Sequence, residues 1–357
     1  MATGKRLAIH FLSLLLLLPG AALAAVYSNL YAFGDSLLDS GNAYQITKTI
    51  DPFSSYPVSP PYAQRFSNGP VASQVLAQDL GLTALPSQLG GTNYATGGAT
   101  SGTANFAGLA YGGLTLPPPF TSLPNQIALL SSSNTGGLTQ QVDLFKSAPP
   151  ADISSSLVLV WAGANDLFLT SALIANGSLP PDANTFTQAA DAAASNVESA
   201  IDTLIGAGAK HILAVNLPNF GEIPAADDPT NPLAPFWPGY TDEFNKQFLD
   251  ADYLAGLDPS VHLTEFDIRG LLDDVISNPA KYNLTNVTDA CLPTVGPMPV
   301  APPCSDPGEY LFWDSAHPTA AADRIIGDAF ARAVPEPSSI ALLIVPLGLL
   351  IAGRRRG

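Results

Sequence analysis

Three residues far apart in the chain have the side-chain types that serine-based acyl transfer requires. Ser36 follows a short apolar run, Leu30 to Phe33, and a glycine, so it lies where a buried strand ends and a turn begins. His317 precedes a proline, which disfavours helix at the histidine and leaves its side chain on a loop. Asp314 lies three residues before it, close enough to accept from its Nδ1–H. Together they predict a nucleophile, a base and an orienting acid.

Elimination among the histidines favours the same base. Beyond residue 24 the chain contains only His211, His262 and His317. His211 opens an apolar run and His262 lies within another, so both are interpreted as structural residues of strands. An isolated Asp-x-x-His sequence is usually an ordinary loop. The interpretation of His317 as a base therefore depends on whether other parts of the chain contain the remaining groups that acyl transfer needs.

Acyl transfer also needs hydrogen-bond donors for the oxyanion that develops on the substrate carbonyl. The backbone N–H of Ser36 and that of Gly98, within the paired glycines of a predicted strand at 92–99, are two candidates. The side-chain amide of Asn165 is a third, since it follows the apolar run at 156–161. Carboxyl ends of parallel strands meet at one edge of a sheet. We therefore expect these groups to converge with the serine.

Strand and helix patterns alternate along the body of the chain. This order predicts an α/β fold, a parallel sheet with helices on both faces, in one domain at 25–333. The predicted strands are 30–33, 92–99, 156–161, 211–215 and 261–266, and the predicted helices are 71–80, 122 or 125 to 145, 182–205, 240–255 and 319–332. Four Pro-rich or polar loops, at 43–65, 100–120, 220–238 and 283–312, are expected to shape the rim of a site.

The first 24 residues have the pattern of a secretory signal peptide. Lys5 and Arg6 precede an apolar run at 7–19, and Ala22-Leu23-Ala24 offers small residues for cleavage. A first transmembrane helix is the competing interpretation, but the run is short and ends in Pro19-Gly20. We expect the protein to be exported.

The last residues, 334–357, have three parts. Pro335-Glu336-Pro337 precedes an apolar run at 340–352, and an arginine cluster at 354–356 follows. The run is shorter than the roughly 20 residues that a membrane span needs. This tail resembles a PEP-CTERM sorting signal of Gram-negative bacteria. The resemblance implies transient membrane attachment, a sorting protease or transpeptidase as partner, and delivery to the cell surface or an extracellular polysaccharide matrix. A permanent short anchor is the alternative.

Charge and cysteine content limit the possible partners. Between residues 25 and 334 the chain has nine Lys and Arg against 29 Asp and Glu, a net charge of −20. Such a surface repels nucleic acid and anionic lipid, so no nucleic-acid partner is expected. The only cysteines, Cys291 and Cys304, lie in one Pro-rich stretch. In an exported chain they predict a local disulfide, and no metal site is expected because further ligands are missing.

Four sequence blocks resemble, in order and spacing, those of the GDSL (SGNH) hydrolases, particularly the branch with plant-type GDSL lipases and bacterial haemolysin-like phospholipases. The blocks are Phe33-Gly34-Asp35-Ser36-Leu37-x-Asp39-x-Gly41-Asn42, Asn93-Tyr94-Ala95-x-Gly97-Gly98-Ala99, Gly163-x-Asn165-Asp166 and Asp314-x-x-His317-Pro318. The resemblance implies a three-layer α/β/α sandwich with a flavodoxin-like parallel sheet, and serine-ester hydrolysis without cofactor or metal. By it, Ser36 is the nucleophile, His317 the base and Asp314 its acid, while Ser36, Gly98 and Asn165 form the oxyanion hole.

Several functions remain open at this stage. A lipase or esterase acting on acyl esters ranks first, a deacetylase of matrix polysaccharide second, and a phospholipase or acyltransferase third. A matrix protein that keeps the fold for carbohydrate binding is the non-enzyme alternative, but it would have no use for all of the polar residues named above. The Gly-x-Ser-x-Gly elbow typical of α/β-hydrolases is absent around Ser36.

Overall fold

A parallel sheet of four strands forms the centre of the computed structural model, which describes residues 27–334. The predicted signal peptide and sorting tail lie outside the described residues. The strands are β1 (Leu30–Gly34), β2 (Leu157–Trp161), β3 (His211–Val215) and β4 (His262–Phe266), neighbouring one another in that order. All residues of β1 and β2 are buried, as expected for a sheet that is covered on both faces. Four of the five predicted strands are thus confirmed.

The fifth predicted strand, at 92–99, is wrong as a regular strand. The segment nevertheless runs parallel to β1: Tyr94 N–H donates to Ala32 O at 2.7 Å, and Thr96 N–H to Gly34 O at 3.1 Å. The ladder is incomplete because Gly34 N–H donates to Gln141 Oε1 at 2.9 Å and not to this segment. If this segment is counted as the outer strand, the order becomes 2-1-3-4-5, which is the flavodoxin-like order.

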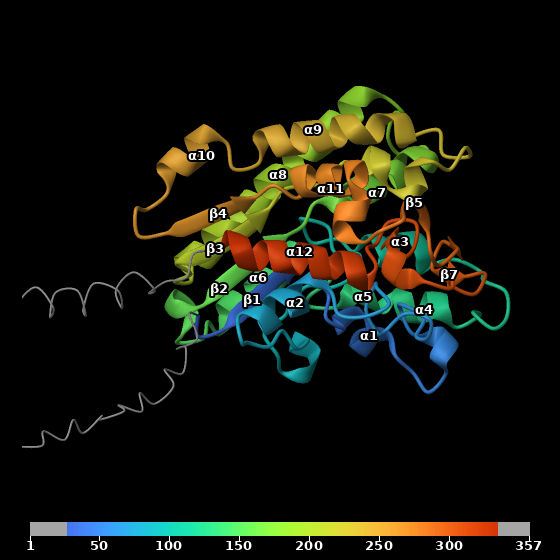
Figure 1. Cartoon of the computed structure of the whole chain (residues 1–357), viewed down its shortest axis with the longest axis horizontal. Coiled ribbons are helices and arrows are strands. Elements are labelled where there is room, and N and C mark those ends of the chain that lie inside the picture. Colours follow the sequence, from blue (N-terminus) through green and yellow to red (C-terminus); the bar gives the residue numbers. More distant parts are fainter. Residues whose placement is uncertain (1–26, 335–357) are drawn as a thin grey trace, which may run out of the picture.

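Helices pack on both faces of the sheet and complete three layers (Figure 1). Val158 and Val160 of β2 face one core, together with residues of α6 and α8, while Leu157 and Leu159 face the other, together with residues of α2 and α12. The helices are α1 (Asn42–Thr47), α2 (Ala72–Asp79), α3 (Phe106–Tyr111), α4 (Leu123–Ile127), α5 (Leu129–Ser132), α6 (Leu138–Ser147), α7 (Ala164–Ala175), α8 (Ala183–Gly206), α9 (Trp237–Gln247), α10 (Ala251–Gly256), α11 (Ile268–Ser277) and α12 (Ala320–Ala333). The predicted α/β/α architecture is confirmed.

Two predicted helices are interrupted. The one expected up to Phe145 is divided into α4, α5 and α6, because the chain at Gly137 passes so close to another segment that a Cβ there would lie 2.3 Å from the carbonyl oxygen of Gly102. The one expected at 240–255 ends at Gln247 and resumes at Ala251, since Leu249 adopts a positive φ of 51°. Each break lies where a tertiary contact or a turn overrides local helix propensity.

Helices α1, α3, α7 and α11, and the regular structure within residues 283–312, were not predicted. That stretch contains β5 (Asn286–Ala290), which pairs with β8 (Tyr310–Phe312), and a small hairpin of β6 (Thr294–Val295) and β7 (Met298–Pro299). The strands are short and mostly half-buried, so no long apolar run marks them. The expectation of an irregular loop there was wrong, although the stretch does border the site.

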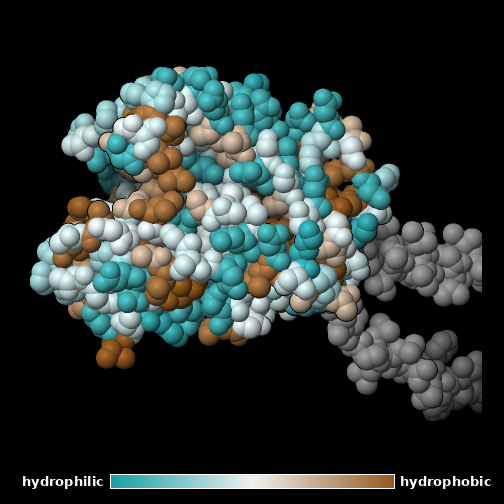
Figure 2. All heavy atoms as spheres, turned by 180° about the vertical axis from the view of Figure 1, so that it is seen from behind, coloured by the Kyte–Doolittle hydropathy of each residue, from teal (hydrophilic) through white to brown (hydrophobic). Residues whose placement is uncertain are grey.

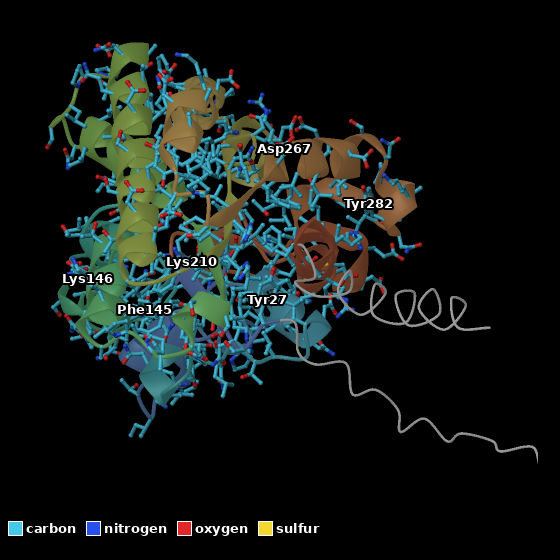
Figure 3. All side chains as sticks on the ribbon, turned by 90° about the vertical axis from the view of Figure 1, so that its left-hand side faces the viewer. Tyr27, Phe145, Lys146, Lys210, Asp267 and Tyr282 are labelled. Carbon is cyan, nitrogen blue, oxygen red and sulfur yellow. A yellow bond between two sulfur atoms is a disulfide. The ribbon has the colours of Figure 1, made fainter. Side chains whose placement is uncertain are left out.

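Both ends of the described chain lie where the strands of the sheet begin. Tyr27 and Val334 belong to the same buried cluster, beside Leu30 of β1 and Phe330 of α12. Figure 1 shows both ends of the described chain on the same side of the molecule, and Figure 3 looks onto that side, with Tyr27 and Lys210 labelled near its centre. The carboxyl ends of the strands, where Ser36 lies, are at the opposite end. Within residues 27–334, no helix has both the length and the apolar character needed to cross a bilayer.

Candidate active site

Ser36, His317 and Asp314 lie in one hydrogen-bonded line. Ser36 Oγ is 2.8 Å from Nε2 of His317, and Nδ1 of the same ring is 2.8 Å from Oδ2 and 2.9 Å from Oδ1 of Asp314. The serine comes from the turn after β1, and the other two residues come from the segment between β8 and α12. His211 and His262 stack on each other in β3 and β4, away from this line. The structure thus brings together the three residues that the sequence singled out.

Electrostatics in the line favour a charged carboxylate and a basic imidazole. Burial raises the pKa of Asp314, but the His317 charge and hydrogen bonds from His317, Tyr62 and Ala316 outweigh burial, so its pKa lies below the ordinary value. Burial lowers the pKa of His317, but attraction to Asp314 outweighs it, so its pKa lies above 6.5. Near neutral pH the carboxylate is therefore ionised and able to stabilise an imidazolium.

Tyr62 is a site residue that the sequence analysis missed. Its hydroxyl donates to Asp314 Oδ2 at 2.6 Å, and its ring packs edge-on against Trp313. Burial, followed by the negative charge of Asp314, raises the pKa of Tyr62 well above its ordinary value, so the hydroxyl stays a donor. The residue lies in the Pro-rich stretch at 43–65, where no spacing connects it with position 314. No signal in a single sequence identifies it.

The turn after β1 fixes the direction of the Ser36 side chain. Gly34 has a φ of 148°, and a Cβ there would stand 1.9 Å from the Trp161 carbonyl oxygen, so only glycine lets β1 end this close to β2. Asp35 Oδ1 accepts from the Leu37 N–H at 3.1 Å and closes the turn. Gln141 clamps Gly34 from α6 through two hydrogen bonds, at 2.9 and 2.8 Å.

The three predicted oxyanion donors border the same cavity as Ser36 Oγ. Within residues 27–334, the backbone N–H groups of Ser36 and Gly98 donate to no protein acceptor, which leaves both available to a ligand. Asn165 lies in the first turn of α7 and not on a loop, and its amide donates one hydrogen bond to Ala99 O at 3.0 Å. The same amide also lowers the pKa of the Asp35 carboxyl by hydrogen bonding, so Asn165 lies between Ala99, Asp35 and the cavity that it lines.

Asp39 holds the Gly98 turn against the Ser36 turn. Its Oδ2 accepts from Gly97 N–H at 2.9 Å and Ala43 N–H at 3.0 Å, and its Oδ1 accepts from Gly41 N–H at 2.7 Å. Asn105 supports the turn from behind, with its Nδ2 2.9 Å from Gly97 O. The sequence analysis quoted Asp39 within the first block and gave it no role of its own. In the structure, this buried carboxylate joins the turn that contains Gly98 to the chain that follows Ser36.

A cavity of about 200 Å³ opens over Ser36 and is lined mainly by aromatic and aliphatic side chains. Each of the four loops that were expected to form the rim contributes to its wall. The lining includes Tyr56 and Tyr62 from the first loop, Phe106 and Tyr111 from the second, Phe220, Ala225 and Trp237 from the third, and Thr294, Gly296 and Pro297 from the fourth. The lining contains no lysine or arginine, and its only acid is Asp314. Such a wall suits an uncharged, apolar ligand.

Cys291 and Cys304 form a disulfide, as predicted. The bond closes a loop that carries the β6–β7 hairpin, whose residues Thr294, Gly296 and Pro297 border the cavity. Cys291 N–H donates to the carbonyl oxygen of Phe312 at 3.1 Å, two residues before Asp314. The disulfide thus fastens one wall of the cavity to the segment that carries Asp314 and His317. No group of His, Cys, Asp and Glu among the described residues is arranged to hold a metal ion.

Two more carboxylates lie near the serine: Asp35 is fully buried and Asp166 is half-buried. Burial raises the pKa of Asp35 to about 7, and that of Asp166 to about 6. Asp166 accepts from the N–H and the hydroxyl of Ser101, each at 2.8 Å, and so joins the start of α7 to the segment after Gly98. Negative charge on Asp35 also contributes to the raised pKa of His317. The protonation of Asp35 therefore influences the base.

Comparison with known proteins identifies the family. The family model described as GDSL-like lipase/acylhydrolase matches residues 30–330. One GDSL esterase/lipase of Arabidopsis thaliana is 30% identical to this chain, with 84% of each chain covered. A second from the same plant is 29% identical, with 82% of this chain and 85% of the relative covered, and a third is 26% identical, with 84% and 87% covered. The chain is a carboxylic ester hydrolase, and it belongs to the GDSL-like lipase/acylhydrolase family.

Proposed function

We propose that Ser36 is the nucleophile of an exported esterase or lipase that cleaves acyl esters, with His317 as its base and Asp314 as the acid that orients the base. The observation that carries the proposal is the line of hydrogen bonds from Ser36 Oγ to Asp314, at 2.8 Å on each side of the imidazole, beneath an apolar cavity. A neutral imidazole at this distance accepts the serine proton as the hydroxyl attacks an ester carbonyl.

The chemistry then proceeds in two halves. Attack by Ser36 Oγ places negative charge on the carbonyl oxygen, and the N–H groups of Ser36 and Gly98 and the amide of Asn165 donate to it. Collapse of this intermediate breaks the bond to the alcohol, which leaves with the proton held on Nε2 of His317. Water, deprotonated by the same nitrogen, then attacks the acyl-serine. This attack releases the carboxylic acid and restores the Ser36 hydroxyl.

The cavity wall favours acyl esters over the alternatives. Among residues 27–334, no lysine or arginine lines the cavity, so its wall offers no cationic partner for a phosphate group. The aromatic wall offers apolar area for an acyl chain. The proposed export pathway, with its sorting signal at 334–357, leaves a deacetylase of matrix polysaccharide as the second candidate. The non-enzyme alternative is excluded by membership in a family of ester hydrolases.

Two measurements test the proposal. The purified chain should hydrolyse nitrophenyl esters of short and medium acyl chains, and a Ser36→Ala variant should lose this activity while keeping its far-UV circular dichroism. Acetate release from acetylated polysaccharide, measured beside ester turnover, ranks the two substrate classes. Hydrolysis by Ser36→Ala protein that is free of contaminating esterase would exclude Ser36 as the nucleophile. The mass of the protein recovered from the medium of a producing bacterium tests processing at both ends.

A further inference from the structure

The mouth of the cavity is built from stretches of sequence that carry no charge. No Asp, Glu, Lys or Arg occurs at 52–64, 80–142 or 290–305, although 12% of the whole chain is charged. Residues from all three stretches line the cavity, among them Tyr56, Phe106 and Thr294. In a domain with a net charge of −20, this concentration of uncharged sequence around one site needs an explanation.

The same stretches expose large apolar side chains beside the cavity. These are Phe53, Leu109, Leu114, Leu129, Val295 and Val300, exposed by between 40% and 61%, and we call them the collar. Leu85 and Leu89 of the second stretch are exposed to a similar extent, but no residue at 80–97 lines the cavity, so they are not counted in the collar. Val295 lies between two residues that line the cavity, and Leu109 lies between Phe106 and Tyr111, which also line it. Figure 2 shows a hollow at this end of the molecule with hydrophobic residues on its rim.

Contacts join the three stretches into one surface. The ring of Phe53 packs edge-on against that of Phe120, with centroids 5.7 Å apart, and the hydroxyls of Ser54 and Ser122 are hydrogen-bonded. A Cβ on Gly296 would stand only 3.7 Å from the Tyr111 ring, so the tip of the hairpin meets α3. Figure 1 places α3, α4 and β7 together at the end opposite the two chain termini. The three stretches that carry the collar are therefore neighbours in space and form one connected border of the cavity.

We propose that the collar docks on the surface of an uncharged lipid aggregate, so that acyl esters enter the cavity without crossing bulk water. This inference rests on the proposed function, since it states how the substrate reaches Ser36. Exposed apolar area of this kind marks an interaction site, and aliphatic side chains insert favourably at a lipid boundary. The absence of charge removes the cost of desolvating ions on docking. The net charge of −20 disfavours an anionic bilayer.

One side of the mouth differs and sets the direction of approach. The stretch at 220–238 also lines the cavity, through Phe220, Ala225 and Trp237, but it carries Glu222, Asp227 and Asp228. Asp227 and Asp228 are exposed. These acids stay in water when the collar inserts. The lipid surface therefore meets the molecule on the side of α3, α4 and the hairpin, and the acidic loop remains outside.

The test uses a tryptophan placed in the collar of the full chain. Val295 is 61% exposed in a short strand, where tryptophan is well tolerated. Emission from a Val295→Trp variant should shift to the blue on adding phosphatidylcholine vesicles, and brominated acyl chains should quench it. The parent chain supplies the background from its own tryptophans. The matched control is Leu254→Trp, 42% exposed on α10 at the far end, which should neither shift nor be quenched.

The same fluorescence test is repeated with vesicles of another lipid composition and with a sugar polymer. Replacing part of the phosphatidylcholine by phosphatidylglycerol should weaken the response, most strongly at low salt. An unchanged Val295→Trp spectrum with every vesicle would overturn the proposal. A response to acetylated polysaccharide in place of vesicles would also overturn it and make the collar a carbohydrate-binding surface. Both tryptophan variants have the same two chain ends. Binding of vesicles through either end therefore cannot produce a difference in fluorescence response between the two variants.

A kinetic comparison separates docking from catalysis. The ratio of the rate on an emulsified neutral ester to the rate on a dissolved short-chain ester should fall about tenfold in a Leu109→Ser, Val295→Ser double variant, which corresponds to about 1.4 kcal/mol of lost docking free energy. Leu254→Ser should leave the ratio unchanged. If no ester is hydrolysed and Val295→Trp still inserts, the proposed function fails and the docking surface remains. If esters are hydrolysed at an unchanged ratio and nothing inserts, the docking proposal alone fails.

Discussion

The hydroxyl of Tyr62 donates a 2.6 Å hydrogen bond to Oδ2 of Asp314, the oxygen that also lies 2.8 Å from Nδ1 of His317. A residue from the loop at 43–65 thereby holds the carboxylate that we propose orients the base. The bond also lowers the pKa of Asp314. The position of the Asp314 carboxylate thus depends on a residue that lies 252 positions away in the sequence.

Replacing Tyr62 by phenylalanine tests this relationship. Loss of one hydrogen bond to a charged group should lower kcat about tenfold and leave KM nearly unchanged, because the hydroxyl acts through Asp314. The freed carboxylate stabilises the imidazolium more strongly, so the acid limb of the kcat profile should move to higher pH. Tyr111→Phe, a change in the same cavity wall, is the control and should leave the acid limb in place.

Asn165→Ala should reduce kcat by about 10²–10³ with a smaller effect on KM, the usual result of losing one oxyanion donor. The prediction follows from the position of the Asn165 side chain, which lines the same cavity as Ser36 and Gly98. Steady-state kinetics on a nitrophenyl ester provide the measurement. An effect confined to KM would make Asn165 a residue that binds the ground state.

Activity should fall on the acid side with an apparent pKa above 6.5, because His317 must be neutral to accept the serine proton and its pKa is raised. Asp35→Asn should move the acid limb of the pH–activity profile to lower pH, because the negative charge on Asp35 helps to raise the pKa of His317. Profiles of kcat/KM against pH for both proteins decide the point. Coincident limbs would show that Asp35 does not influence the base.

Stability should change with pH in the opposite direction from activity. The folded-state pKa of Asp35 is about 7, above the ordinary 3.8, so the folded protein binds its proton more tightly than the unfolded chain does. The stabilisation is complete below pH about 4 and is lost as pH rises through 7. Urea unfolding should give a lower free energy of unfolding at pH 8 than at pH 5, with a smaller difference in Asp35→Asn protein.

Removing the disulfide with a Cys291→Ser, Cys304→Ser double variant should lower the free energy of unfolding by about 3 kcal/mol on the loop-entropy argument. The sequence separation of 13 residues sets this magnitude. The β6–β7 hairpin should also loosen at the cavity wall and raise KM more than it lowers kcat. Urea unfolding and steady-state kinetics of the same preparation provide both measurements.

Local sequence patterns predicted the features of the fold and the site that depend on neighbouring residues, and they did not predict those that depend on distant contacts. Ser36 was identified because it follows the end of an apolar run. His317 was identified because a proline follows it and few other histidines occur, and Asp314 because it lies three residues before His317. Continuous apolar strands such as β2 were identified because burial on both faces leaves a run of apolar residues. Tyr62 and the collar were missed because their roles depend on loops meeting in space. The break at Leu249 was missed because a positive φ at a leucine is set by its surroundings.

Tyr27 and Val334 lie in one buried cluster, at the end of the sheet where the strands begin. Helix α12 starts at Ala320, three residues after His317, and its 14 residues carry the chain about 20 Å from the base before Val334 is reached. A molecule tethered through either end therefore points its catalytic mouth away from the support. If the proposed sorting signal fixes the protein to its own cell, the enzyme faces outward and meets substrates that arrive from the surroundings. Immobilisation through either terminus on a bead or an electrode should likewise leave turnover intact.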